Sequence, residues 1–125
     1  IKCIDKHDYF SMWNKTVDVL HWHNDVVSLP EGAQPLARSA KTKVQAFRFG
    51  SALGMQFHLE VTPTMLEEWL DESSMVKDLK AAGGSKSQLR EAFAEYNPQL
   101  QPLADQVFSS FAARCNSYEQ SLLQA

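Results

Sequence analysis

Hydrophobic and polar positions alternate in the first half of the chain, as they do in strands. Residues 16–23 are rich in β-branched and aromatic side chains, and residues 36–39, 43–49 and 53–61 carry strand-like patterns of the same kind. The connection between the last two segments is only about three residues long, which predicts an antiparallel hairpin.

Apolar positions in the second half recur at helical spacing instead. Three of the four predicted helices begin at a capping residue: Thr62 before Pro63, Ser85 in a capping box with Gln88, and Asn97 before a proline. The expected helices start at residue 63 and cover residues 74–82, 85–95 and 97–122. The apolar residues of the last helix form one stripe that includes Cys115, which predicts a buried thiol.

These patterns predict a single α/β domain over residues 1–125, strand-rich over 1–61 and helical over 62–125. The length of 125 residues and a hydrophobic content of 44% suit one domain with a buried core. A net charge of −3 without a basic stripe argues against nucleic acid as a partner. No apolar run is long enough for a membrane span. We expect a cytoplasmic protein in which Cys3 and Cys115 are reduced thiols.

The residues best suited to carry chemistry are histidines near a carboxylate. Side chains two apart on a strand share a face, which would pair His21 with His23 and His58 with Glu60. A carboxylate beside an imidazole holds one tautomer and makes the ring a better base. His58 and Glu60 come just before a helix start, at the carboxyl end of a predicted strand, where open α/β sheets bind ligands.

Two other interpretations of the histidines remain open. A lone histidine in a strand is commonly a packed or hydrogen-bonded residue without a function. His21, His23 and His58 could also form a metal site, but the glutamate that a cupin-like HxH site needs is absent from residues 24–28. We therefore expect neither a metal nor another cofactor.

Three segments in register resemble one enzyme family. Residues 53–62 (LGMQFHLEVT) resemble the GxQFHxE segment of class I glutamine amidotransferase domains. Residues 21–25 (HWHND) with 29–33 (LPEGA) resemble the HWHxD…LPxGA segment, and residues 44–50 match as well. The chain is most similar to the branch resembling the glutaminase domain of GMP synthase. The agreement covers residues 17–70, and the helical tail fits loosely.

The resemblance implies a fold and a mechanism. The fold would be the C-terminal half of a flavodoxin-like amidotransferase domain. The mechanism would use a Cys–His–Glu triad that releases ammonia from the side-chain amide of glutamine. His58 would be the base and Glu60 its orienting partner. His23, Asn24 and Asp25 would help to hold the amino-acid end of glutamine.

The family's nucleophile has no counterpart in this chain. It belongs to a GxCxGxQ elbow upstream of the HWH segment, whereas Cys3 lacks the flanking glycines and Cys115 lies in the last helix. From the start at Ile1 we expect either that a segment was removed or that the chain is part of a longer protein. We expect no activity from the chain alone, and a homo-oligomer or a partner chain that covers the open sheet edge. The alternative is a non-catalytic binding or oligomerisation module.

Overall fold

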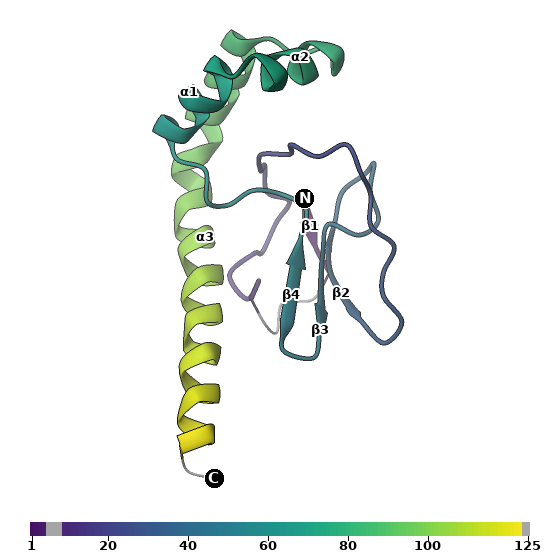
Figure 1. Cartoon of the computed structure of the whole chain (residues 1–125), viewed down its shortest axis with the longest axis vertical. Coiled ribbons are helices and arrows are strands. Elements are labelled where there is room, and N and C mark those ends of the chain that lie inside the picture. The colour runs from purple at the N-terminus through teal and green to yellow at the C-terminus, as the bar shows by residue number, and fades with distance from the viewer. Residues whose placement is uncertain (5–8, 124–125) are drawn as a thin grey trace.

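The computed structural model describes residues 1–4 and 9–123. The described residues form four strands and three helices: β1 (Lys2–Cys3), β2 (Gln34–Arg38), β3 (Ala46–Phe49), β4 (Ala52–Met55), α1 (Pro63–Asp71), α2 (Ser73–Ala81) and α3 (Lys86–Leu123). Figure 1 shows the sheet beside the long α3, with α1 and α2 at one end of the molecule. The mixed α/β class is therefore confirmed.

The sheet is an antiparallel meander in the order β1-β2-β3-β4. The predicted hairpin is confirmed, with β3 and β4 joined through Gly50 at a φ of 57°. Gly54 pairs with Phe47, and a Cβ at position 54 would lie 2.6 Å from the Phe47 ring. Every strand pairing among the described residues is antiparallel, and His58 follows the carboxyl end of β4.

Two of the predicted strands are wrong over much of their length. Residues 16–23 form no strand, and only Leu20 makes an isolated bridge, to His58. Val19 and Leu20 are both buried although they are consecutive, so the segment does not alternate between two faces. The predicted strand over 53–61 ends at Met55. Beyond it, the N–H groups of Gln56 and His58 bond to the carbonyls of Gln45 and Leu20, and these bonds do not form a continuous ladder.

The helix starts were predicted more accurately than the helix breaks. The Thr62 hydroxyl accepts a hydrogen bond from the backbone N–H of Met65 at 3.2 Å, which confirms the cap of α1. The Ser85 hydroxyl accepts from the N–H of Gln88 at 3.3 Å ahead of α3. The break expected near Asn97 is wrong, since α3 continues through Pro98 and Pro102. Both prolines lie on its exposed side, while buried residues before and after them hold the helix against the core.

Helix α3 packs against two hydrophobic clusters. The sheet cluster includes Leu36, Ala46 and Phe57 and receives Leu100, Ala104 and Val107 of α3. The helical cluster combines Leu20, Val61, Leu66, Leu70 and Phe93, and Tyr96 packs against both clusters. The connection between the sheet and α1 therefore lies where the two clusters meet.

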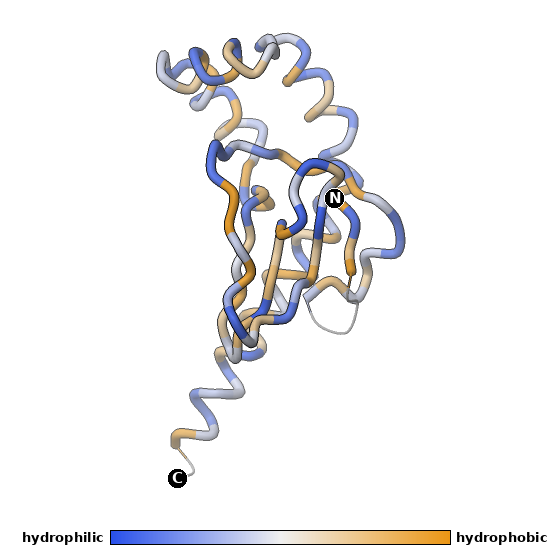
Figure 2. The backbone as a smooth tube through the Cα atoms, turned by 90° about the vertical axis from the view of Figure 1, so that its right-hand side faces the viewer, coloured by the Kyte–Doolittle hydropathy of each residue, from blue (hydrophilic) through white to orange (hydrophobic). Residues whose placement is uncertain are grey.

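The last part of α3 extends beyond the sheet, as Figure 2 shows. The stripe predicted to be buried is exposed there: Phe111 is 44% exposed, Tyr118 67% and Leu122 60%. Cys115 is exposed as well, so the prediction of a buried thiol was wrong. The reason is that the sheet ends before the helix does. None of the helices in the described part of the chain combines the length and the hydropathy needed to cross a membrane.

Candidate active site

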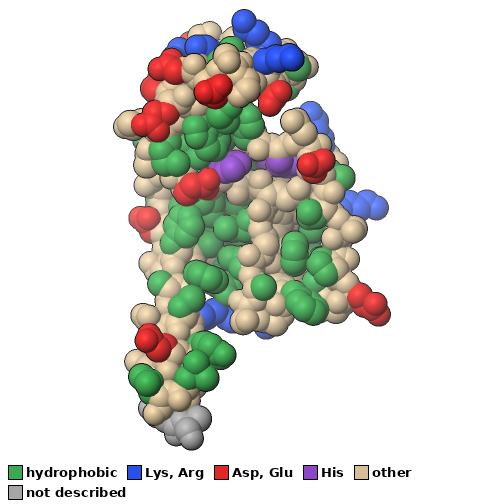
Figure 3. All heavy atoms as spheres, in the orientation of Figure 1, with side chains coloured by type: hydrophobic (Ala, Val, Ile, Leu, Met, Phe, Trp, Pro, Cys, Tyr) green, Lys and Arg blue, Asp and Glu red, His purple; other side chains and the backbone are tan. Residues whose placement is uncertain are grey.

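The candidate site lies where the segment after β4 meets the segment around Leu20. The backbone N–H of His58 donates to the carbonyl of Leu20 at 2.9 Å. This bond brings His58 beside the residues that follow Leu20, although the two are far apart in sequence. In Figure 3 the purple histidine side chains lie between the helical end of the molecule and the sheet.

His58 and Glu60 form a direct side-chain pair. The distance from His58 Nδ1 to Glu60 Oε1 is 2.7 Å, and the other carboxylate oxygen accepts from the N–H of Leu59 at 3.0 Å. An ionised carboxylate only accepts, so Nδ1 carries the proton and Nε2 keeps a free lone pair. The His58 side chain is 27% exposed.

The electrostatics of Glu60 favour its charged form. Partial burial raises the pKa of Glu60, but the hydrogen bonds from His58 and from the backbone outweigh it, so the pKa lies below its ordinary value. Glu60 therefore remains an anion at neutral pH. An anion at this place holds the His58 ring and stabilises it when the ring takes up a proton.

A second contact to His58 comes from α1. The ring of Trp69 meets the His58 ring at a centroid distance of 5.2 Å and an interplanar angle of 85°. Trp69 in turn contacts Trp22 at 5.6 Å and 81°. The sequence patterns place Trp69 only in the core. Trp69 lies six residues after Pro63, the first residue of α1, and this position shortly after the HxE segment is the signal in the sequence that indicates the contact.

The three residues predicted to bind substrate belong to one loop. His23 Nδ1 lies 2.7 Å from the carbonyl oxygen of Asp25, which also accepts from the side-chain amide of Gln56 at 2.9 Å. The Asn24 and Asp25 side chains are exposed. Gln56 lies in the motif quoted above, but only the structure shows that it ties this loop to the His58 segment.

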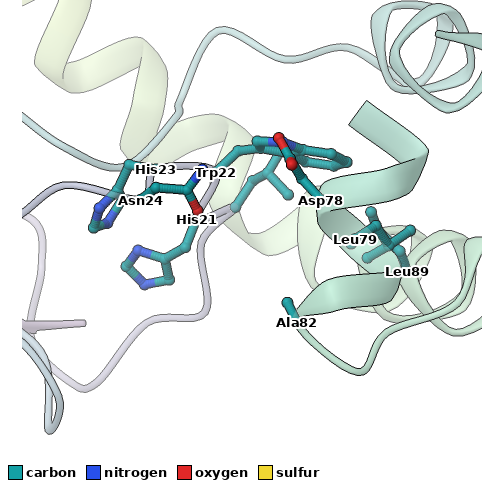
Figure 4. A pocket seen from close by; sticks show the side chains of 9 residues that line it. His21, Trp22, His23, Asn24, Asp78, Leu79, Ala82 and Leu89 are labelled. Atoms are coloured by element: carbon teal, nitrogen blue, oxygen red, sulfur yellow. The ribbon is translucent and has the colours of Figure 1, made fainter. Parts of the chain in front are cut away.

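A small pocket opens beside the same loop. It is lined by Leu20, His21, Trp22, His23 and Asn24 on one side and by Asp78, Leu79, Ala82 and Leu89 on the other. Figure 4 shows these two groups, with the His21 and His23 rings turned away from α2. His23 and Asn24 thus border a cavity, whereas Asp25 is not among its lining residues.

His21 lies close to the other histidines. Its ring is 5.8 Å from that of His23, centroid to centroid. Partial burial lowers the pKa of His21, and repulsion from the chain's amino group and from the rings of His23 and His58 when these are protonated lowers it further. Within residues 1–4 and 9–123, no three His, Cys, Asp or Glu side chains gather in a way that could hold a metal ion. The metal-site alternative therefore has no support from the geometry.

Neither cysteine is placed as a partner of His58. Cys3 lies in β1, where its thiol contacts the carbonyl of Phe10 at 4.0 Å, and Cys115 is exposed on α3. Cys3 and Cys115 form no disulfide within the described residues. The contacts described for His58 come from Leu20, Glu60 and Trp69.

The His58–Glu60 pair thus lies between the sheet and α1. The sequence matches the profile of the family "Glutamine amidotransferase class-I" over residues 1–76. This chain belongs to the class I glutamine amidotransferase family.

The fold has a counterpart among solved structures. The chain is similar to a glutamine amidotransferase from Thermotoga maritima with a TM-score of 0.78 and 24% sequence identity. The match covers 88% of this chain and 47% of the Thermotoga chain, so this chain spans about half the length of that relative. No curated protein matches the chain.

Proposed function

We propose that this chain provides the base and its orienting carboxylate to a glutaminase site of the Cys–His–Glu type. The observation that carries the proposal is the 2.7 Å contact between His58 Nδ1 and Glu60 Oε1. It leaves Nε2 free to take the proton of a nucleophilic thiol. The thiolate then attacks the side-chain amide carbon of glutamine, and the same proton leaves with the nitrogen as ammonia.

The loop that contains His23, Asn24 and Asp25 is proposed to hold the amino-acid end of glutamine. Gln56 supports this role because it fixes the loop to the segment of His58 through the carbonyl of Asp25. His23 and Asn24 also line the adjoining pocket. A loop attached to the base in this way would position the substrate relative to the proton acceptor.

The nucleophile and its oxyanion hole are proposed to come from another segment, in a longer chain or a partner chain. In that arrangement the 125 residues are the C-terminal half of a flavodoxin-like domain, of the branch similar to the glutaminase domain of GMP synthase. The two outer strands, β1 and β4, each pair on one side only within the described sheet, which supports a homo-oligomer or a partner chain. A monomer in light scattering would contradict the homo-oligomer.

The experiment extends the chain in frame with the coding sequence upstream of Ile1 and measures ammonia release from glutamine. We expect that sequence to encode a GxCxG elbow, the extended protein to release ammonia, and residues 1–125 alone to release none. His58→Ala in the extended protein should lower kcat by about 10²–10⁴. Phe108→Leu, far along α3, is the matched control and should retain the rate.

Two results would contradict the proposal. One is an upstream sequence without a cysteine elbow. The other is an extended protein whose ammonia release is unaffected by His58→Ala. Ammonia release from the 125 residues alone that disappears on Cys3→Ala would instead identify Cys3 as the nucleophile and overturn the proposed division of the site.

A further inference from the structure

We propose that Trp69 is a positioning residue for the His58 imidazole and that Trp22 holds Trp69 in place. The inference rests on the proposed function of His58 as a base, and it adds a second constraint on that base besides Glu60. Its evidence is the chain of ring contacts from Trp22 to Trp69 to His58.

His58 needs a second constraint because its backbone lies outside a regular strand. Residues 56–60 form no continuous strand pairing with a neighbouring segment. The backbone hydrogen bond described for His58 runs from its N–H to the carbonyl of Leu20. A hydrogen bond at Nδ1 fixes one point of the ring, but the ring can still turn about the line to Glu60. The perpendicular contact with Trp69 opposes that rotation, because aromatic rings favour such edge-to-face arrangements.

Trp69 is well suited to hold another ring. It lies in α1 between Leu66 and Leu70, whose side chains are 2% and 0% exposed. Helix α1 is capped by Thr62, two residues after Glu60. The start of the helix is therefore close in sequence to His58 and Glu60. The helix therefore supplies a rigid support at short sequence distance from the base.

Trp22 connects this support to the proposed substrate loop. It precedes His23 and packs with Trp69 against the helical cluster. A displacement of Trp22 would thus reach His58 through Trp69. The two tryptophans join both candidate parts of the site, the base and the loop, through side-chain packing.

The test uses nuclear magnetic resonance spectra of the histidine rings in the 125-residue chain, which can be read whether or not the chain has glutaminase activity. Trp69→Leu should move the His58 ring signals toward those of an unstructured peptide and speed the exchange of its Nδ1 proton. Trp69→Phe, which keeps an aromatic ring, should retain most of the wild-type pattern. Met65→Ala is the matched control, because Met65 packs in the same cluster one turn earlier.

Unchanged His58 signals in Trp69→Leu would overturn the inference, and so would equal changes in Met65→Ala. Should Trp69→Leu fail to fold, a nuclear Overhauser contact between the His58 and Trp69 rings of the wild-type chain decides: its presence supports the inference and its absence overturns it. In the extended enzyme, Trp69→Leu should lower kcat by about tenfold to a hundredfold with KM within about twofold. Trp69→Phe should recover most of the loss. An extended enzyme without activity would count against the proposed function while leaving the ring-contact result intact.

Discussion

His58 Nδ1 lies 2.7 Å from Glu60 Oε1 although neither residue belongs to a strand. Phe57, Leu59 and Val61, which alternate with the pair along the chain, are each buried at 4% exposure or less. Alternate side chains anchored in the core leave His58 and Glu60 on the opposite side. The pair is thus produced by burial of its neighbours, and a sheet ladder is not needed for it.

The contact should make the stability of the chain pH-dependent through Glu60. Because the pKa of Glu60 is lowered by folding, its contribution is present above the unfolded value of about 4.3 and is lost as the pH falls through the lower folded pKa. We expect Glu60→Gln to unfold at a lower urea concentration than wild type at pH 7. The difference should shrink as the pH falls below about 4.3 and through the lower folded pKa. A difference that is independent of pH would contradict this origin.

The hydrogen bond from the Gln56 side chain to the Asp25 carbonyl should restrict the motion of the loop that contains His23, Asn24 and Asp25. Gln56→Met keeps the size of the side chain and removes its amide, so the loop loses a hydrogen bond worth about 0.5–1.5 kcal/mol. Faster amide hydrogen exchange is expected over residues 23–27, with residues 86–100 as the internal control. In the extended enzyme the KM for glutamine should rise. Equal exchange rates in both proteins would show that the bond does not order the loop.

The two ends of the apolar stripe on α3 should differ in their effect on stability. Leu100 is 3% exposed and Leu122 is 60% exposed. Leu100→Ala should cost about 2–5 kcal/mol of unfolding free energy. Leu122→Ala should stay within about 0.5 kcal/mol. Urea denaturation measures both, and a large, concentration-dependent cost at Leu122 would indicate that the stripe is covered in an oligomer.

Gly54 should not tolerate a side chain. A Cβ at this position would lie 2.6 Å from the ring of Phe47 on the paired strand, so the ring or the strand must move. We expect Gly54→Ala to destabilise the chain by about 1–3 kcal/mol, as overpacking does. Ser51→Ala in the exposed hairpin connection is the control and should change little. Thermal unfolding of the two variants would test the difference, and equal midpoints would argue against the clash.

Local signals predicted those parts of the fold that local chemistry determines. The hairpin connection at Gly50 and the cap at Thr62 depend on a few neighbouring residues, and both are observed. The break at Asn97 was wrong because a capping residue followed by proline is also compatible with a helix that packing stabilises on both sides. Phe93 and Leu100 lie buried before and after this point.

The sequence by itself determined the family, the alternation that puts His58 and Glu60 on one side, and the mixed α/β class, because each depends on residue type and spacing. Only the tertiary structure decided that the segment at Leu20 bridges to His58, that Trp69 meets its ring, and that Gln56 reaches Asp25. These contacts join residues 11 to 38 positions apart, and the contact between Trp22 and Trp69 spans 47 positions. Their geometry depends on how two hydrophobic clusters pack against one helix, which no local pattern records.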